Sequence, residues 1–232
     1  MSLSRVFSHI YQVNLWQSSE SASGRGSEVA TTAKVRESIS ALLQNLSIKS
    51  IVDAPCGDFN WMSQVSLNNI EYLGLDIVPD VIERVRAKYE KPGLIFKTGD
   101  LTRTILPTVD LIICRDGLVH LSFSDIFSAL EKFKSSQSTY MLTTTYPNLS
   151  TNRNVASGSW RAINLEKPPF NFSPPTLIFS DPSDDTGSHP DKSLALWSLK
   201  DIELSPPAQF SFSSLQISVI SFIRRFIPSF LL

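Results

Sequence analysis

The chain has little of several residue classes that mark specialised proteins. Two of its 232 residues are cysteine, too few for a small scaffold held together by disulfides. The three histidines, His9, His120 and His189, are scattered and give no metal-ligand spacing. The formal charge of -1 supplies no basic surface for a nucleic-acid backbone. We therefore expect no structural zinc and no nucleic-acid partner, and small molecules are the favoured partners.

Long apolar runs are also missing. The most apolar stretch, residues 213–232, is interrupted by Arg224 and Arg225, so it lacks the roughly 20 consecutive apolar residues that a spanning helix needs. We expect no transmembrane segment, and we expect a cytoplasmic protein. Residues 205–232 are predicted to form an atypical apolar tail, which docks on the domain, serves self-association or partner binding, or lies on a membrane surface.

Glycine is sparse where a dinucleotide-binding turn would need it. An apolar segment ends at Asp53 and is followed by a turn with a single glycine, Gly57, where the dinucleotide fingerprint has three. Carboxylates on both sides of this turn would repel a pyrophosphate, whereas they would attract or tolerate a net-cationic sulfonium nucleoside. The turn therefore predicts S-adenosyl-L-methionine as the cofactor and argues against NAD.

Three further apolar segments end near charged residues, at Asp76, Asp100 and Arg115. A carboxylate at a strand end can accept two hydrogen bonds from vicinal ribose hydroxyls, and we predict this role for Asp76. Asp100 is predicted to face the adenine edge. Each carboxylate alone fits a helix cap or a turn equally well, but their recurrence favours one nucleoside-binding rim.

The apolar pattern predicts an α/β fold. It indicates helices near residues 5–16, 28–46, 59–67, 79–90 and 122–135. It indicates strands near 49–53, 71–76, 94–98, 109–114 and 138–145, followed by an antiparallel pair near 175–180 and 194–200. We predict a Rossmann-like, mostly parallel seven-stranded sheet with helices on both faces, whose strands all present their carboxyl ends on one rim.

Longer motifs narrow the prediction. The chain carries Ser-Gly-x-Gly-Ser, Val-Asp-x-x-Cys-Gly-Asp-Phe-x-Trp-Met, Gly-x-Asp, Arg-Asp-x-x-x-His-Leu and Asn-x-x-x-Gly-x-Trp-Arg, at residues 23–27, 52–62, 74–76, 115–121 and 154–161. With these motifs it resembles the class I S-adenosylmethionine-dependent methyltransferases, and more narrowly a little-characterised bacterial-type group. Pro55 and Phe59 stand where glycines often occur in the superfamily, and this departure affects the contacts to the methionine end of the cofactor.

The resemblance implies a methyltransferase domain at residues 1–204, in which the N-terminal helical part forms a lid with the small residues 23–27. It also implies cofactor contacts by a set of residues at the strand ends and in the turns after them: Asp53, Gly57, Trp61, Asp76, Ile77, Asp100, Leu101 and Arg115.

His120 is the candidate general base, because histidine titrates near neutrality and this one follows Asp116 by about one helical turn. A packed or capping histidine is the alternative. Asp116 is predicted to orient His120 or to touch the acceptor. Trp160 and Arg161 are predicted to bind the acceptor through an apolar wall and a cationic fork, and the alternative for Trp160 is a loop anchor.

These residues predict transfer of a methyl group from S-adenosyl-L-methionine to an oxygen or nitrogen of an unidentified small-molecule acceptor. The alternative is a catalytically inactive cofactor-binding protein that acts as a partner or regulatory subunit. Residues 181–191, rich in aspartate, serine and proline, are predicted to be solvated.

Overall fold

The computed structural model describes residues 2–183 and 187–207. Its helices are α1 (Leu3–Gln12), α2 (Ala33–Asn45), α3 (Pro79–Tyr89) and α4 (Phe123–Ser135). Its strands are β1 (Ser50–Asp53), β2 (Glu71–Asp76), β3 (Leu94–Thr98), β4 (Leu111–Cys114), β5 (Tyr140–Thr145), β6 (Leu177–Ser180) and β7 (Ser193–Ser198). Short 3₁₀ segments occur at Arg25–Ser27, Met62–Gln64, Leu118–His120 and Leu199–Asp201. Most of the predicted apolar tail, residues 208–232, lies outside the described residues.

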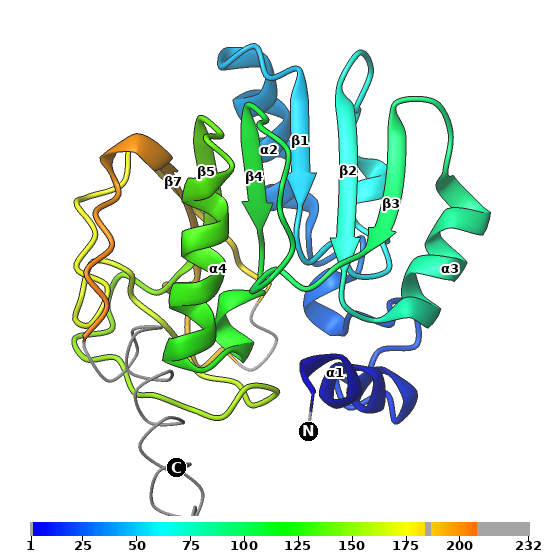
Figure 1. The fold of residues 1–232 in the computed structure, drawn as a ribbon. Helices are drawn as coiled ribbons and strands as arrows, with labels where there is room; N and C mark the ends of the chain where they lie inside the picture. The colour runs from blue at the N-terminus through cyan, green and yellow to red at the C-terminus, as the bar shows by residue number, and fades with distance from the viewer. Residues whose placement is uncertain (1, 184–186, 208–232) are drawn as a thin grey trace, which may run out of the picture.

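The strands form one seven-stranded sheet in the order β3-β2-β1-β4-β5-β7-β6. Strand β1 pairs in parallel with β2 and with β4, and β7 pairs antiparallel with both β5 and β6. The predicted mostly parallel sheet and its late antiparallel pair are therefore confirmed (Figure 1).

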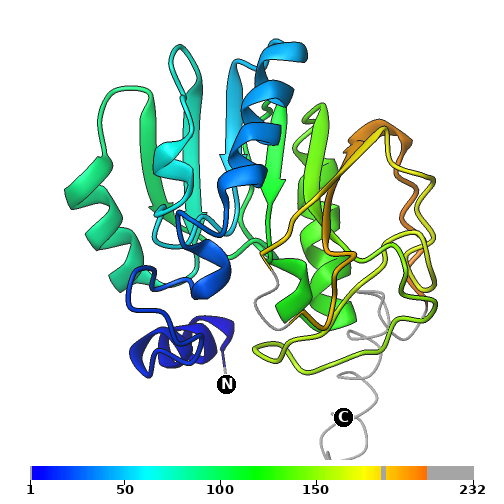
Figure 2. The ribbon, with the colours of Figure 1, turned by 180° about the vertical axis from the view of Figure 1, so that it is seen from behind.

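Helices cover both faces of this sheet, as predicted. Helix α4 lies on one face (Figure 1), and α2 is seen on the other face when the molecule is turned (Figure 2). The two faces bury separate apolar cores. The buried stripe of α4 is Ile126, Phe127, Leu130 and Phe133, and that of α3 is Val81, Ile82 and Val85. Packing of these stripes on the sheet stabilises the helices more than their intrinsic propensity does.

The helix predicted at residues 59–67 is wrong. The structure has only a 3₁₀ segment, Met62–Gln64, between β1 and β2. Phe59 takes a left-handed backbone conformation with φ of 58°, which an α-helix cannot contain. Its buried ring packs on Tyr72 and Phe96, with centroids 5.2 Å and 5.0 Å away. Burial of this aromatic side chain outweighs the local helical tendency.

The register brings the predicted strand ends together. Asp53 is opposite Gly74 of β2 and Ile113 of β4, so the carboxyl ends of three neighbouring strands meet at one edge. Helix α1 lies across this edge (Figure 1). The fold therefore places an N-terminal helix over the rim on which open α/β sheets bind ligands.

Gly74 is a position where the fold tolerates no side chain. A Cβ there would lie 2.5 Å from Phe96 Cδ1 and 3.0 Å from Cys56 Sγ. Because both neighbours are buried, we expect Gly74→Ala to lower the free energy of unfolding by about 1–3 kcal/mol. Urea unfolding measures the change. Gly26→Ala is the matched control, since its Cβ would have ordinary contacts at 3.5 Å and beyond; equal effects of the two changes would contradict the prediction.

Candidate functional site

A cavity of about 550 Å³ lies at the carboxyl edge of the sheet, within the usual size range of small-molecule sites. It is lined by α1 and residues 23–27, by the segments that follow β1, β2, β3 and β4, and by residues before β7. Segments far apart in the sequence thus enclose one space.

Most of the predicted site residues line this cavity. They are Gly57, Trp61, Asp76, Ile77, Asp100, Leu101, Arg115, Asp116, His120 and Trp160. Of the predicted site residues, Asp53 and Arg161 are outside its lining.

Asp53 is buried beneath the rim, with 1% of its surface exposed. Its carboxylate accepts a hydrogen bond of 2.5 Å from the Tyr72 hydroxyl. Burial raises the pKa of Asp53 to about 7, although the Tyr72 hydrogen bond and the charge of Arg115 lower it. Asp53 therefore lies outside the cavity in which the predicted cofactor contact would be made. Its side chain instead joins β1 to Tyr72 of β2.

Arg161 is buried outside the cavity lining, contrary to the predicted acceptor contact. Its guanidinium donates to the backbone carbonyls of Leu118 and Leu121 at 2.8 Å and 2.7 Å, and only 1% of the residue is exposed. Burial lowers its pKa to about 10. These two bonds join Arg161 to carbonyls on both sides of His120, so Arg161 holds the segment that carries His120.

Asp76 is the most buried carboxylate in the cavity lining, with 3% of its surface exposed. Its two oxygens accept from the backbone N–H groups of Gly57 (3.1 Å) and Val78 (2.9 Å). Burial raises its pKa to about 6, against the effect of these two bonds. Each carboxylate oxygen has a second lone pair, so Asp76 can still accept from ligand hydroxyls.

The segment around residues 21–23 is fastened to the turn after β1. Asp58 accepts from the Ala22 N–H at 2.7 Å and from the Ser21 hydroxyl at 3.0 Å, and its own N–H donates to Ser23 Oγ at 3.1 Å. Gly57 has a φ of 55°, and a Cβ there would lie 2.2 Å from Ser23 Oγ. Glycine at this position therefore lets the N-terminal segment close over the turn.

Asp100 sits beside the cavity with a local role as well. Its Oδ1 accepts from the N–H and the hydroxyl of Thr102 at 2.9 Å and 2.7 Å. This geometry fixes the turn after β3, and the lining residue Leu101 lies within that turn.

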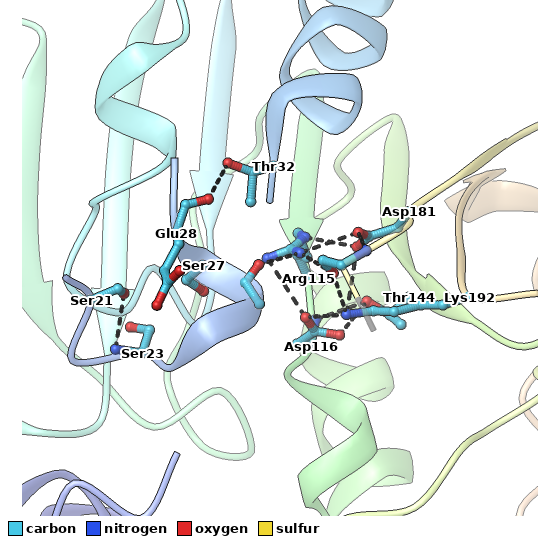
Figure 3. A network of polar contacts seen from close by, with 12 residues as sticks. Ser21, Ser23, Ser27, Glu28, Thr32, Arg115, Asp116, Thr144, Asp181 and Lys192 are labelled. Atoms are coloured by element: carbon cyan, nitrogen blue, oxygen red, sulfur yellow. Dashed lines mark hydrogen bonds and ion pairs between the residues drawn. The ribbon is translucent and has the colours of Figure 1, made fainter. Parts of the chain in front are cut away.

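Arg115 connects the two segments that cover the cavity (Figure 3). Its guanidinium donates to Asp181 (2.9 Å), to Ser183 Oγ (2.7 Å) and to the carbonyl of Gly26 (2.8 Å). Burial alone would lower the pKa of Arg115, but the carboxylates of Asp181 and Asp116 raise it above its ordinary value. The predicted cofactor residue is thus also a structural link between β4, the N-terminal segment and the β6–β7 connection.

Lys192 completes a network of two cations and two carboxylates. Its ammonium group lies 2.7 Å from Asp116 Oδ2 and 3.7 Å from Asp181 Oδ2. Burial opposes ionisation of Asp116, but Lys192 and Arg115 hold its pKa well below its ordinary value. Asp181 is fully buried, so the expectation that this part of residues 181–191 is solvated is wrong; pairing with two cations offsets the cost of burying its charge.

Asp116 has a strained backbone, with a φ of 54°. Its N–H donates to Thr144 Oγ1 at 2.8 Å, and its carboxylate hydrogen bonds involve Lys192 and Thr144. Asp116 therefore acts on His120 through its charge, which raises the His120 pKa, rather than through a hydrogen bond in this structure.

His120 has one ring nitrogen occupied. Nδ1 lies 3.2 Å from the carbonyl oxygen of Ser159, which can only accept, so Nδ1 carries the proton and Nε2 has the free lone pair. Burial lowers the pKa of His120 below its ordinary value, although Asp116 and Ser159 oppose the shift. A neutral imidazole with a free Nε2 at pH 7 is a suitable general base.

Several residues of the site were not predicted from the sequence. Lys192 and Asp181 are far from Asp116 and Arg115 in the sequence, and only the folding of the chain brings them together. Trp16, Tyr146 and His189 also line the cavity. Of these residues, only Trp16 could have been found from the sequence, because it lies in the N-terminal stretch that was predicted to form the lid with residues 23–27.

Comparison with known proteins agrees with this geometry. A family model described as a methyltransferase domain matches residues 51–136. No curated protein shows significant similarity to the chain. Among the described residues, no helix is long and apolar enough to cross a membrane, and no group of three or more His, Cys, Asp or Glu side chains could hold a metal ion.

Solved structures share the fold at low sequence identity. The methyltransferase domain of bacterial CtHen1-CN is 14% identical, with a TM-score of 0.53, over 72% of this chain and 99% of that one. Human N-acetylserotonin methyltransferase, solved with SAM, is 14% identical, with a TM-score of 0.55, over 85% of this chain and 60% of that one. Magnesium protoporphyrin IX methyltransferase from Synechocystis PCC 6803, with bound SAM, is 13% identical, with a TM-score of 0.50, over 67% of this chain and 80% of that one. The chain therefore has the Rossmann-like fold of class I methyltransferases.

The raised pKa of Asp53 predicts a pH-dependent stability. An unfolded aspartate ionises near its ordinary value, whereas the folded one retains its proton up to about pH 7, so stability falls as the pH rises through that window. Asp53→Asn removes the ionisation and keeps an acceptor for Tyr72. We expect the variant to be more stable than the parent by at least about 1 kcal/mol near pH 8, and equally stable below about pH 4. Urea unfolding at both pH values measures this; a pH-independent difference would contradict it.

The ion-pair network predicts a strong effect at Lys192. Lys192→Met leaves the buried Asp181 and the partly exposed Asp116 with one cation, so we expect a loss of about 3–5 kcal/mol in the free energy of unfolding. The double variant Lys192→Met, Asp116→Asn restores the charge balance and should recover most of the loss. Chemical denaturation of the parent, both single variants and the double variant gives the coupling. Additive effects would show that the two side chains do not interact.

Proposed function

We propose that the chain is an S-adenosylmethionine-dependent methyltransferase that acts on an oxygen or nitrogen of a small-molecule acceptor. The observation that carries the proposal is the buried Asp76 carboxylate at the end of β2, in the lining of a cavity on the carboxyl edge of this fold. The matching methyltransferase-domain model and the SAM-bound structures of the same fold support it.

The residues present fit the proposed cofactor. Asp76 has lone pairs for the ribose hydroxyls, and the neighbouring Ile77 and Leu101 supply apolar surface for a flat base. Asp100 is close to that surface and can accept from an exocyclic amine. Trp61 lies beneath the Arg115 guanidinium, 5.1 Å from ring centroid to Cζ, and both side chains border the cavity.

The bound cofactor would supply an electrophilic methyl group on a sulfonium, and the electron pair of the broken C–S bond would return to sulfur. The protein then has two tasks. It holds the acceptor in line with that methyl, which can lower the barrier by roughly 7–11 kcal/mol. His120 Nε2 takes the proton that a hydroxyl acceptor loses and passes it to solvent.

The proposed methyltransferase domain comprises residues 1–204, with α1 and residues 23–27 as its lid. Partners other than a small-molecule acceptor are not part of the proposal. A role of residues 205–232 in self-association stays a prediction, because residues 208–232 lie outside the described part of the chain.

Two measurements test the proposed function together. Calorimetric titration with S-adenosylhomocysteine should show saturable binding with one site per chain, and NAD should not compete. Incubation with a methyl-labelled donor and fractionated small-molecule extracts should then label an acceptor. Absence of S-adenosylhomocysteine binding would refute the proposal, and binding without label transfer to any fraction would favour a cofactor-binding regulatory protein.

Asp76→Ala should weaken S-adenosylhomocysteine binding by about 1.5–3 kcal/mol, the value expected for charge-assisted hydrogen bonds. Asp110→Ala is the matched control. Asp110 also accepts from backbone N–H groups, those of Lys49 and Ser50, but at the opposite edge of the sheet. Calorimetry measures the S-adenosylhomocysteine affinity of both folded variants. If Asp76→Ala binds as tightly as Asp110→Ala, Asp76 does not contact the cofactor.

His120→Ala should lower the single-turnover rate by about two to four powers of ten with little change in cofactor affinity. The parent's rate should fall on acidification, with an apparent pKa below the ordinary histidine value of about 6.5, because burial favours the neutral ring. The exposed His9 provides the control variant His9→Ala. If His120→Ala lost thermal stability but kept its rate per folded molecule, the histidine would be structural.

A further inference from the structure

The half of the cavity near β4, β5 and β7 indicates which acceptor the enzyme takes. Resting on the function proposed above, we propose that the acceptor is an uncharged aromatic alcohol, with its ring against Trp160 and its hydroxyl at His120. Three independent features of the cavity carry this inference: its aromatic wall, its charge balance and the free nitrogen of His120.

The aromatic wall consists of Trp16, His120, Tyr146, Trp160 and His189, all of which line the cavity. The Trp16 and His120 centroids are 5.4 Å apart, and those of Trp160 and His189 are 5.2 Å apart. Rings at these separations already contact one another edge to face or tilted. A planar ligand ring would extend the same arrangement, which favours offset and T-shaped contacts.

Trp160 is the exposed member of this wall, with 44% of its surface accessible. Its position is nevertheless fixed, because the flanking residues hydrogen-bond to the segment that carries His120: the Gly158 N–H to the His120 carbonyl at 2.8 Å, and the Arg161 N–H to the Val119 carbonyl at 3.1 Å. A large apolar side chain held open to a cavity is a site for an apolar ligand surface. A ring stacked there would be held close to His120.

The charges of the cavity disfavour an anionic acceptor. Three Arg and Lys residues line the cavity. Arg115 and Lys192 are paired with Asp116 and Asp181, and Arg25 donates its Nε–H to the Gln17 carbonyl at 3.0 Å. Arg161 is committed to backbone carbonyls. A ligand carboxylate would therefore approach Asp116 without gaining a new ion pair, and its desolvation would be uncompensated. An uncharged ring avoids this cost.

The hydroxyl requirement follows from His120. Its Nδ1 faces Ser159, so Nε2 is the nitrogen that can accept a proton. An aromatic hydroxyl is acidic enough, with a pKa near 10 for a tyrosine-like phenol, to transfer its proton to imidazole as the oxygen takes the methyl group. The phenol O–H bond breaks as its proton moves to His120 Nε2, and the new O–CH₃ bond forms as the C–S bond of the methyl donor would break with its electron pair going to sulfur.

Three probes with the same bicyclic carbon skeleton test the inference: naphthol, its saturated analogue decalol, and hydroxynaphthoate. Calorimetry with S-adenosylhomocysteine comes first, because failure of that binding refutes the methyltransferase proposal itself. With S-adenosylhomocysteine bound, naphthol should then bind about threefold to tenfold more tightly than decalol, and at least about tenfold more tightly than hydroxynaphthoate. Naphthol should also accept labelled methyl from S-adenosylmethionine.

Variants at Trp160 locate the effect. Trp160→Phe should keep the preference for naphthol over decalol, whereas Trp160→Leu should abolish it while S-adenosylhomocysteine affinity stays unchanged. If S-adenosylhomocysteine binds but decalol or hydroxynaphthoate binds as well as naphthol, the acceptor class is wrong although the cofactor site stands. A naphthol preference that survives in Trp160→Leu would likewise overturn the assigned subsite.

Discussion

The ion pair between Arg115 and Asp181 connects parts of the chain that are 66 residues apart, with Nε and Oδ2 at 2.9 Å. The same guanidinium holds Gly26 and Ser183. This guanidinium ties the N-terminal segment to the end of β4 through the Gly26 carbonyl. It also holds the β6–β7 connection there, together with the Lys192–Asp116 ion pair. The cavity depends on these contacts, because two of its walls are these segments. A buried charge pair of this kind contributes little net stability relative to apolar packing, but it fixes geometry.

The carboxylates at the rim differ in their environment, and this gives them different roles. Asp53 and Asp76 are buried, and their hydrogen bonds come from Tyr72 and from backbone N–H groups rather than from cations. Burial therefore dominates and raises the pKa of each carboxyl group. Asp116 is partly exposed and lies beside Lys192 and Arg115, which keep it ionised. The result is one side of the cavity that offers the Asp76 carboxylate as a hydrogen-bond acceptor, and another side where Lys192 and Arg115 are paired with Asp116 and Asp181. His120 lies on the second side, with a neutral ring at physiological pH.

Local patterns predicted those features that local forces determine. The apolar stripes of α3 and α4, the strands and the acidic strand ends were predictable, since each depends on residues within a few positions of one another. The missing helix after β1 was not, because burial of the Phe59 ring against Tyr72 and Phe96 decides that segment. Nor were Lys192 and Asp181, which meet Asp116 and Arg115 across 76 and 66 residues. Arg161 was predicted to bind the acceptor because of its residue type, whereas in the structure its guanidinium donates to two backbone carbonyls.

In the proposed function, the carboxyl edge of the sheet binds a methyl-donor nucleoside on the Asp76 side, with its sulfur toward His120. A crystal structure of the protein with S-adenosylhomocysteine decides whether it does. We expect ribose hydroxyls within hydrogen-bond distance of Asp76, beneath α1 and residues 23–27, with the sulfur facing the Asp116 and His120 side of the cavity. A ligand bound elsewhere, or bound here with its sulfur turned toward Asp100, would contradict it.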